Sequence, residues 1–322
     1  MTKPEPILKI GNLEVLYEAG RRRRIQAVSD VSFEMTQGET LGLVGESGCG
    51  KSSIARAVMQ LPPPTSGRVM FFGEDLTGVS PLRLRQLRPR LQMIFQDSAA
   101  ALNPRRKVGE TIAMPLRVAG KVPRENRNKR AREMMSAVGL DPALFGHRPF
   151  QLSGGQCQRV QFARALMTEP ALLICDEPVS SLDVSIQAQI LNLLEQVRIR
   201  HGLTILFISH DMAVVKNVCD RVAVMYLGRL CEAAPTEALY RQPAHPYTAV
   251  LINAIPMAGP VISRPDIKAV TTDLPSPIDP PAGCRFHTRC PLARDRCAKV
   301  EPAMESVGPC RQAACHYPLC SG

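Results

Sequence analysis

Hydrophobic positions in the first part of the chain fall into short runs, and the spacing within each run predicts the element it forms. Residues 7–10, 13–17 and 25–35 alternate imperfectly between apolar and polar side chains, which predicts strands. Residues 41–44 form a continuous apolar run that ends in a glycine-rich loop, and residues 52–59 then predict a helix. This order of strand, loop and helix is what a phosphate-binding loop requires.

The middle of the chain alternates between amphipathic stretches and continuous apolar runs. Residues 81–147 are rich in Arg and Ala and contain amphipathic stretches, so we expect them to be mostly helical. Residues 172–175 and 205–208 are uninterrupted apolar runs of the kind found in buried parallel strands. A helical pattern over residues 186–200 separates the two runs. Parallel strands joined by helices predict an α/β fold.

The composition changes near residue 235. Long periodic helices disappear there and proline becomes frequent, at Pro256, Pro260, Pro265, Pro275, Pro277, Pro280 and Pro281. A short helix is expected over residues 247–254, and the remainder is expected to be loop held together by its cysteines. We therefore divide the chain of 322 residues into a large domain, 1–235, and a small C-terminal domain, 236–322.

Charge and hydropathy narrow the classes of partner. The net charge of +11 permits a nucleic-acid or anionic lipid surface, but nucleotide handling and solubility account for an excess of this size. The densest basic cluster, residues 21–24, lies between predicted strands, where a solvated hairpin loop is the default. No apolar run approaches the roughly 20 residues of a membrane span, and the N-terminus, which begins Met1-Thr2-Lys3-Pro4, lacks a secretory signal. We expect a cytosolic protein, or one attached to a membrane through other subunits.

The glycine-rich loop has the spacing Gly-x-x-x-x-Gly-Lys-Ser. Its glycines let backbone N–H groups converge on phosphate oxygens, and the following helix adds the positive end of its dipole. Lys51 supplies a positive charge for the β- and γ-phosphates, and Ser52 supplies a hydroxyl to Mg²⁺. The loop predicts ATP binding by Gly45, Glu46, Ser47, Gly48, Cys49, Gly50, Lys51, Ser52 and Ser53.

A second motif places two carboxylates at the end of the apolar run 172–175. Asp176 suits the coordination shell of Mg²⁺, and Glu177 suits the orientation or activation of an attacking water. Acidic residues often follow strands, so the motif alone is only moderate evidence for a nucleotide site. It becomes strong evidence in combination with the phosphate loop that precedes it in the chain.

A third motif is a Ser-Gly-Gly turn that opens a predicted helix. Such a turn is a potential anion site, because helix N-termini present free N–H groups. Taken alone, an ordinary capped helix with a glycine-rich entry is the simpler interpretation. The residues concerned are Ser153, Gly154, Gly155 and Gln156.

Together the motifs occur in the order of an ABC-transporter ATPase subunit, and residues 7–235 resemble its nucleotide-binding domain. The resemblance implies a P-loop NTPase fold with a RecA-like core, an antiparallel β subdomain and a helical subdomain. It also implies Mg²⁺-dependent hydrolysis of ATP. The further positions that match are Gln96, Leu152, Pro178, Ser181, Leu182, Asp183, His210 and Asp211.

The resemblance assigns roles to individual residues. Tyr17 resembles the aromatic residue that stacks on adenine, and His210 resembles the switch histidine that contacts the γ-phosphate. Gln96 resembles the glutamine that contacts Mg²⁺ and water and senses the membrane subunits. The 153–156 turn is similar to the signature loop, which acts on ATP held by the opposite subunit, and Asp183 lies in the loop that crosses between subunits. The resemblance therefore implies a head-to-tail dimer with two ATP molecules at its interface.

Three further stretches narrow the resemblance to the dipeptide/oligopeptide/nickel importer family. They are residues 92–97 followed by 101–105, residues 242–248, and the cysteine-rich tail. This family implies a second ATPase subunit, two transmembrane permease subunits and an extracytoplasmic solute-binding protein as partners, with no nucleic acid. It also implies a peripheral position on the cytoplasmic face of the cell membrane. Peptides or peptide-like solutes are the expected cargo.

Six of the 11 cysteines lie in the last 39 residues, which suggests a metal site rather than disulfides in a reducing compartment. The gaps of five, six and seventeen residues after Cys284, Cys290 and Cys297 lack the tight pairs typical of zinc, so zinc and iron–sulfur both stay open. The family resemblance implies a 4Fe–4S cluster on Cys284, Cys290, Cys297 and Cys315. Cys310 and Cys320 are extra, and Cys310 is the nearest rival to Cys315.

Two other classes of function compete with an importer ATPase. One is an ABC ATPase of nucleic-acid repair or translation, which the basic charge permits. Such proteins usually carry two ATPase modules or long coiled-coil insertions, and this chain shows neither pattern. The other is an exporter ATPase, which the tail and the region around His245 disfavour.

Overall fold

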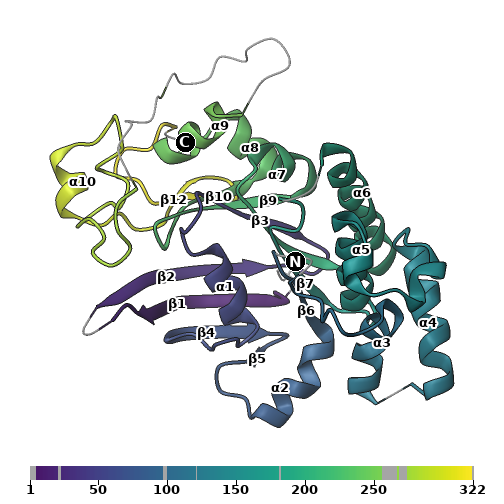
Figure 1. Ribbon diagram of the computed structural model, residues 1–322. Helices are drawn as coiled ribbons and strands as arrows, with labels where there is room; N and C mark the ends of the chain where they lie inside the picture. Colours follow the sequence, from purple (N-terminus) through teal and green to yellow (C-terminus); the bar gives the residue numbers. More distant parts are fainter. Residues whose placement is uncertain are drawn as a thin grey trace. The chain divides into compact units, whose positions relative to one another are not determined.

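The computed structural model describes residues 5–20, 23–96, 100–120, 122–180, 183–255, 267 and 274–320 (Figure 1). The expectations for Arg21, Arg22, Asp97, Ser181 and Leu182, and for the prolines from 256 to 265, lie outside these residues. The chain forms two compact units. Unit 1 comprises Met1–Met35, Glu39–Thr77 and Phe207–Gly322, and unit 2 comprises Thr36–Gly38 and Gly78–Leu206. The proposed boundary near residue 235 falls within unit 1 and stays a prediction.

Unit 1 contains an antiparallel sheet with the strand order β2-β1-β4-β5. Its strands are β1 (Leu8–Glu18), β2 (Arg24–Met35), β4 (Ser66–Phe71) and β5 (Glu74–Asp75). The separate strands expected at 7–10 and 13–17 are one strand, which corrects the sequence interpretation. Asn12 has a positive φ of 47° and the register with β2 shifts between Ile10 and Leu13, as at a β-bulge. The bulge is why the hydrophobic alternation breaks there.

A second sheet in unit 1 carries the phosphate loop. β3 (Thr40–Val44) runs parallel to β9 (Arg221–Tyr226), and β10 (Arg229–Pro235) continues the sheet antiparallel to β9. The C-terminal tail adds two short strands, because β12 (Arg311–Ala313) pairs with β10 and with β11 (Glu305–Gly308). The tail was expected to be loop, so these strands are a correction.

Helices complete unit 1. They are α1 (Lys51–Val58), α7 (Met212–Val218), α8 (Thr236–Arg241), α9 (Pro246–Asn253) and α10 (Asp295–Lys299). α8 and α9 pack against β10, and α7 packs against β3 (Figure 1). The helices expected at 52–59 and 247–254 are confirmed to within one residue as α1 and α9.

In unit 2, part of the segment that was expected to be helical forms a short strand, β6 (Leu91–Ile94), which pairs with β7 (Leu172–Asp176). The two strands are parallel, with Leu91 opposite Leu172, and β8 (Thr204–Ser209) follows β7 in the strand order and continues into unit 1. β6 corrects the expectation of helix over 81–147. Its four residues carry no strand signal of their own, and pairing with a strand 81 positions away decides their conformation.

The remainder of unit 2 is helical, as its amphipathic pattern predicts. The helices are α2 (Pro81–Leu87), α3 (Val108–Ala119), α4 (Arg124–Ala137), α5 (Gly154–Leu166) and α6 (Val184–His201). Single 3-10 turns lie at Arg88–Arg90, Pro142–Gly146 and Pro149–Gln151. α3 packs against both α4 and α5 (Figure 1). Among all the described helices, none is both long and apolar enough to cross a membrane.

Candidate nucleotide-binding site

The glycine-rich loop joins β3 to α1 in a conformation that only glycine allows at its ends. Gly45 has φ 154° and Gly50 has φ 105°. A Cβ on Gly45 would lie 2.1 Å from the carbonyl oxygen of Met225, and one on Gly50 would lie 2.0 Å from that of Ala27. Close approach of two neighbouring backbones therefore requires both glycines of the motif.

Lys51 lies inside this loop, at the first residue of α1. Its side chain is buried, and Nζ donates hydrogen bonds to the carbonyl oxygens of Gly45 (2.7 Å) and Glu46 (2.9 Å). Nζ is also 3.7 Å from Sγ of Cys49, whose thiol pKa is raised by burial. The loop thus closes around its own ammonium group, which holds a positive charge at the centre of the predicted phosphate site.

Two residues that are not among the predicted site residues hold the same loop from outside. The hydroxyl of Tyr247, on α9, accepts a hydrogen bond of 3.0 Å from the backbone N–H of Glu46. Arg289 Nη1 donates to both carboxylate oxygens of Glu46, at 3.0 and 2.8 Å. These partners are 201 and 243 positions from Glu46, and no local pattern in the sequence links them to the phosphate loop.

Two further candidates lie in unit 1. Tyr17 is half-buried near the end of β1, and its hydroxyl bonds to Oγ of Ser53 on α1 at 3.3 Å. The phosphate-loop helix and the proposed adenine-stacking residue are therefore in contact. His210 is exposed directly after β8, and the Asp211 carboxylate caps α7 by accepting from the N–H of Ala213 at 2.8 Å.

In unit 2, the end of β7 brings together residues that lie far apart in the sequence. Asp176 is buried as the last residue of the strand, and Glu177 follows in the left-handed region with φ 48°. Gln96 Nε2 donates to Glu177 Oε2 at 2.8 Å. A non-glycine residue at positive φ is uncommon. In Glu177 this backbone conformation accompanies the hydrogen bond between its carboxylate and Gln96, which follows β6.

The Ser-Gly-Gly turn, also in unit 2, forms the N-terminus of α5. Ser153 Oγ accepts from the N–H of Gln156 at 3.3 Å, and Gln156 Oε1 accepts from the N–H of Ser153 at 2.9 Å. This reciprocal capping box is the simpler of the two sequence interpretations. It leaves Ser153 and Gly154 exposed, so the turn stays accessible to a second molecule. Asp183 is likewise exposed, at the N-terminus of α6.

Four cysteines of the tail line one small cavity in unit 1. They are Cys284, Cys290, Cys297 and Cys315, beside Phe286 and Tyr317. Burial raises the thiol pKa to about 11 for Cys284 and to about 12 for Cys315. Cys310 is exposed and is not among the residues that line this cavity, and Cys320 packs against Ala244 and Ala313.

No group of three or more His, Cys, Asp or Glu side chains in the described part of the chain is placed to hold a metal ion. The finding covers the four thiols of the tail cavity, and it applies equally to zinc and to an iron–sulfur cluster.

Fold and loops together define an ATP-binding cassette, and the comparisons with known proteins agree. Residues 28–180 match the family model of the ABC transporter. The structure aligns with the dimeric post-hydrolysis state of the ATP-binding cassette MJ0796 bound to ADP and Pi, with a TM-score of 0.66, 29% identity and coverage of 71% of this chain and 98% of that one. It also aligns with cbiO1 from Clostridium perfringens, part of the complex cbiONQ, with a TM-score of 0.64, 28% identity and coverage of 73% and 91%.

A second match identifies the branch of the family. Residues 231–297 match the model of the oligopeptide/dipeptide transporter C-terminal region. The oligopeptide transport ATP-binding protein OppF of Escherichia coli (strain K12) is 48% identical over 93% of this chain and 92% of its own length. The probable peptide ABC transporter ATP-binding protein y4tS of Sinorhizobium fredii (strain NBRC 101917 / NGR234) is 46% identical over 97% and 90%. The chain belongs to the ATP-binding subunits of oligopeptide/dipeptide ABC importers, and it is an ATPase.

Proposed function

We propose that this chain hydrolyses ATP to power the import of peptides through two permease subunits. The observation that carries the proposal is Lys51, held at 2.7 and 2.9 Å by the carbonyl oxygens of its own loop inside a chain whose relatives transport oligopeptides. Within unit 1, the loop N–H groups and Lys51 bind the β- and γ-phosphates, Ser52 binds Mg²⁺, and Tyr17 stacks on adenine. His210 contacts the γ-phosphate.

Within unit 2, Asp176 belongs to the coordination shell of Mg²⁺, and Glu177 orients and deprotonates the attacking water. Gln96 contacts Mg²⁺ and holds Glu177 through the 2.8 Å hydrogen bond, so a movement of Gln96 would turn the carboxylate. The water adds to the γ-phosphorus, the bond to the β–γ bridging oxygen breaks, and ADP and inorganic phosphate leave.

Pairing of two ATPase subunits follows from the exposed Ser-Gly-Gly turn. Ser153, Gly154, Gly155 and Gln156 bind ATP held by the partner ATPase, and Asp183 crosses to it. The exposure of Ser153, Gly154 and Asp183 supports this assignment, because a turn that acts on another molecule's nucleotide must be accessible. ATP then closes the pair by binding the closed state more tightly than the open one.

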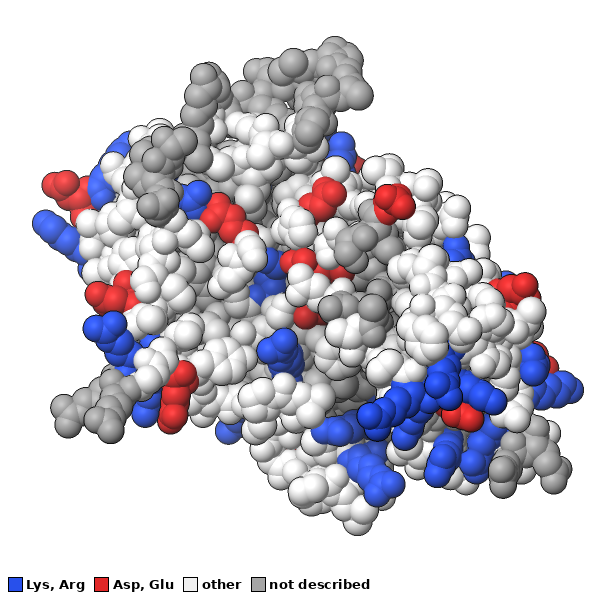
Figure 2. Space-filling view, viewed as in Figure 1, with Lys and Arg blue, Asp and Glu red and all other residues white. Residues whose placement is uncertain are grey.

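The permease contact is proposed on unit 2. Lys and Arg side chains gather over the region of α3 and α4 (Figure 2). A pocket there is lined by Arg106, Glu110, Ala113, Met114, Arg117, Arg127 and Asn128. This basic pocket suits a cytoplasmic segment of the permease that presents acidic side chains or a helix C-terminus. The ATPase thereby takes its place on the cytoplasmic face of the membrane, and a solute-binding protein on the other side delivers the peptide.

Uptake by reconstituted vesicles tests the function. The ATPase, its partner ATPase and both permeases are assembled in vesicles with the solute-binding protein outside and ATP inside. Labelled tri- to pentapeptides should accumulate only with ATP, and the Lys51→Ala variant should abolish accumulation. ATP hydrolysis without peptide accumulation, or co-purification with nucleic acid in place of permeases, would contradict the proposal.

The four-cysteine cavity is proposed to hold a 4Fe–4S cluster through Cys284, Cys290, Cys297 and Cys315. Four thiols lining one small cavity are the donor set that such a cluster needs, and a cluster spreads its ligands more widely than a single ion does. When bound, the cluster would cross-link the tail, which has few apolar residues to pack. Anaerobic purification should yield about four iron atoms per chain and a brown colour. A colourless protein with stoichiometric zinc would overturn this assignment.

A further inference from the structure

The C-terminal region contacts the phosphate loop at Glu46. Arg289 Nη1 reaches both carboxylate oxygens of Glu46 at 3.0 and 2.8 Å, and Tyr247 accepts from its backbone N–H at 3.0 Å. The Arg289 side chain is 13% exposed and that of Glu46 is 29% exposed, so water only partly screens the ion pair. One end of the loop is thus held through its charge and its backbone by residues outside the cassette motifs.

Aromatic packing connects this contact to the cysteine cavity. The rings of Tyr247, Tyr226 and Phe286 form a cluster with centroids 4.8 to 5.2 Å apart. Phe286 is buried, and it also lines the cavity of the four cysteines. Arg289 precedes Cys290, one of those cysteines, in the sequence. The position of Arg289 and Tyr247 therefore depends on the folding of the cysteine region.

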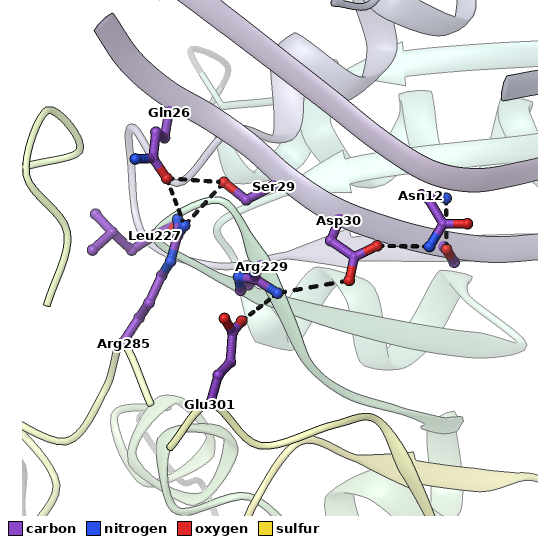
Figure 3. A network of polar contacts seen from close by, with 9 residues as sticks. Asn12, Gln26, Ser29, Asp30, Leu227, Arg229, Arg285 and Glu301 are labelled. Carbon is purple, nitrogen blue, oxygen red and sulfur yellow. Dashed lines mark hydrogen bonds and ion pairs between the residues drawn. The ribbon is translucent and has the colours of Figure 1, made fainter. Parts of the chain in front are cut away.

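A polar network anchors the same region to strand β2 and to the turn that follows β9 (Figure 3). Arg285 Nη2 donates to Gln26 Oε1 at 2.9 Å and to Ser29 Oγ at 3.0 Å, and Nη1 donates to the carbonyl oxygen of Leu227. The next residue, Gly228, donates its N–H to the carbonyl oxygen of Cys49 in the phosphate loop at 2.9 Å. The cysteine region is thus fixed close to the loop by contacts other than those at Glu46.

The charge at Glu46 gives the contact a consequence for nucleotide binding. A carboxylate in a loop that takes up a polyanionic phosphate chain repels the ligand unless a cation neutralises it. Lys51 bonds to the backbone carbonyl of Glu46 and not to the carboxylate, whereas Arg289 bonds to both carboxylate oxygens. An arginine guanidinium is charged at physiological pH, so this contact pairs opposite charges at 2.8 Å.

We propose that Arg289 and Tyr247 are positioning residues of the ATP site, which set nucleotide affinity by neutralising and orienting Glu46. The inference rests on the proposed role of residues 45–52 in phosphate binding. It makes the C-terminal region of this chain a part of the nucleotide site. It predicts that substitutions at the contact with Glu46 raise the KM for ATP and leave kcat nearly unchanged.

The test measures ATPase kinetics of the full chain in its importer complex, together with calorimetric binding of Mg²⁺–ADP. Arg289→Gln should raise the KM for ATP and the Kd for ADP about five- to tenfold, with kcat within about twofold, because a partly buried charge is left unpaired beside the phosphates. Arg289→Lys should restore most of the affinity, since a single nitrogen, Nη1, makes both contacts with the carboxylate.

Two further variants separate charge from support of the fold. The double variant Glu46→Gln with Arg289→Gln removes the repulsive carboxylate as well, so it should bind ADP more tightly than Arg289→Gln alone. Arg241→Gln is the matched control, because Arg241 is an exposed arginine of the C-terminal region on α8, and this variant should leave KM and Kd unchanged.

The inference is overturned by an unchanged Kd in Arg289→Gln, by a loss confined to kcat, or by a double variant as weak as the single one. If Arg289→Gln does not fold, Glu46→Gln alone decides: weaker ADP binding in that variant would contradict the charge argument, and equal or tighter binding supports it. Lys51→Ala distinguishes a failure of this inference from a failure of the proposed phosphate site. Undiminished ADP binding in that variant would refute the phosphate site itself.

Discussion

Replacement of Glu177 by Gln isolates the proposed catalytic carboxylate from its structural surroundings. Glu177 has φ 48° and accepts a 2.8 Å hydrogen bond from Gln96 Nε2. A glutamine of the same length tolerates the same backbone, and its Oε1 can accept the same hydrogen bond. The substitution therefore removes the negative charge and the capacity to take a proton from water, and little else.

The expected size of the effect follows from the proposed role. A positioned general base contributes about 10²- to 10⁴-fold, so kcat should fall about 10³-fold, which corresponds to about 4 kcal/mol in the activation barrier. The remaining hydrogen bond to Gln96 becomes one between neutral groups, and its weakening should cost about 1 kcal/mol of stability or less. Affinity for ATP should stay within about threefold, because the carboxylate is proposed to act on the water and not to bind the phosphates.

Single-turnover hydrolysis of radiolabelled ATP measures the chemical step, and equilibrium binding of ATP measures affinity. Glu169 supplies a matched control, because it is an exposed glutamate of the same unit with nearly the same conformation, φ 50°. Glu169→Gln should retain kcat and stability within about 0.5 kcal/mol. Hydrolysis by Glu177→Gln at near the rate of the parent protein would refute the reasoning, and equal losses in both variants would point to the backbone instead.

Two other predictions test the loop and the start of α9. Gly50→Ala, whose Cβ would lie 2.0 Å from the Ala27 carbonyl oxygen, should abolish ADP binding and cost about 3 kcal/mol or more of stability. Gly20→Ala is the control in thermal unfolding: Gly20 has φ 79° but open space around it, so this variant should lower Tm far less. Burial lowers the pKa of His245 to about 4, and its Nδ1 accepts from the N–H of Tyr247 at 3.0 Å. The unfolded chain therefore takes up a proton at His245 near pH 6.5, whereas the folded chain takes it up only near pH 4. About 3 kcal/mol of stability is present above pH 6.5 and should be lost progressively as the pH falls toward 4. Denaturant titrations at several pH values measure this slope, and His245→Asn should remove it.

Local sequence determined the loops that carry the predicted chemistry. The motif from Gly45 to Ser52 needs a strand before it and a helix after it, and both arise from contiguous residues. The Ser153 turn is similar, because a capping box closes within four residues. The strands β7 and β8 and the helix α6 were also predicted, since their apolar runs or periodicity are unbroken.

Tertiary structure decided everything that depends on pairing across long separations. β6 became a strand through β7, and β12 through β10, because sheet hydrogen bonds are supplied by a partner and not by the residues themselves. The Gln96–Glu177 hydrogen bond has the same origin. The contacts of Arg289 and Tyr247 with Glu46 also arise from tertiary structure. Each of them joins residues more than 200 positions apart, and only the folded chain brings those charges and hydroxyls together.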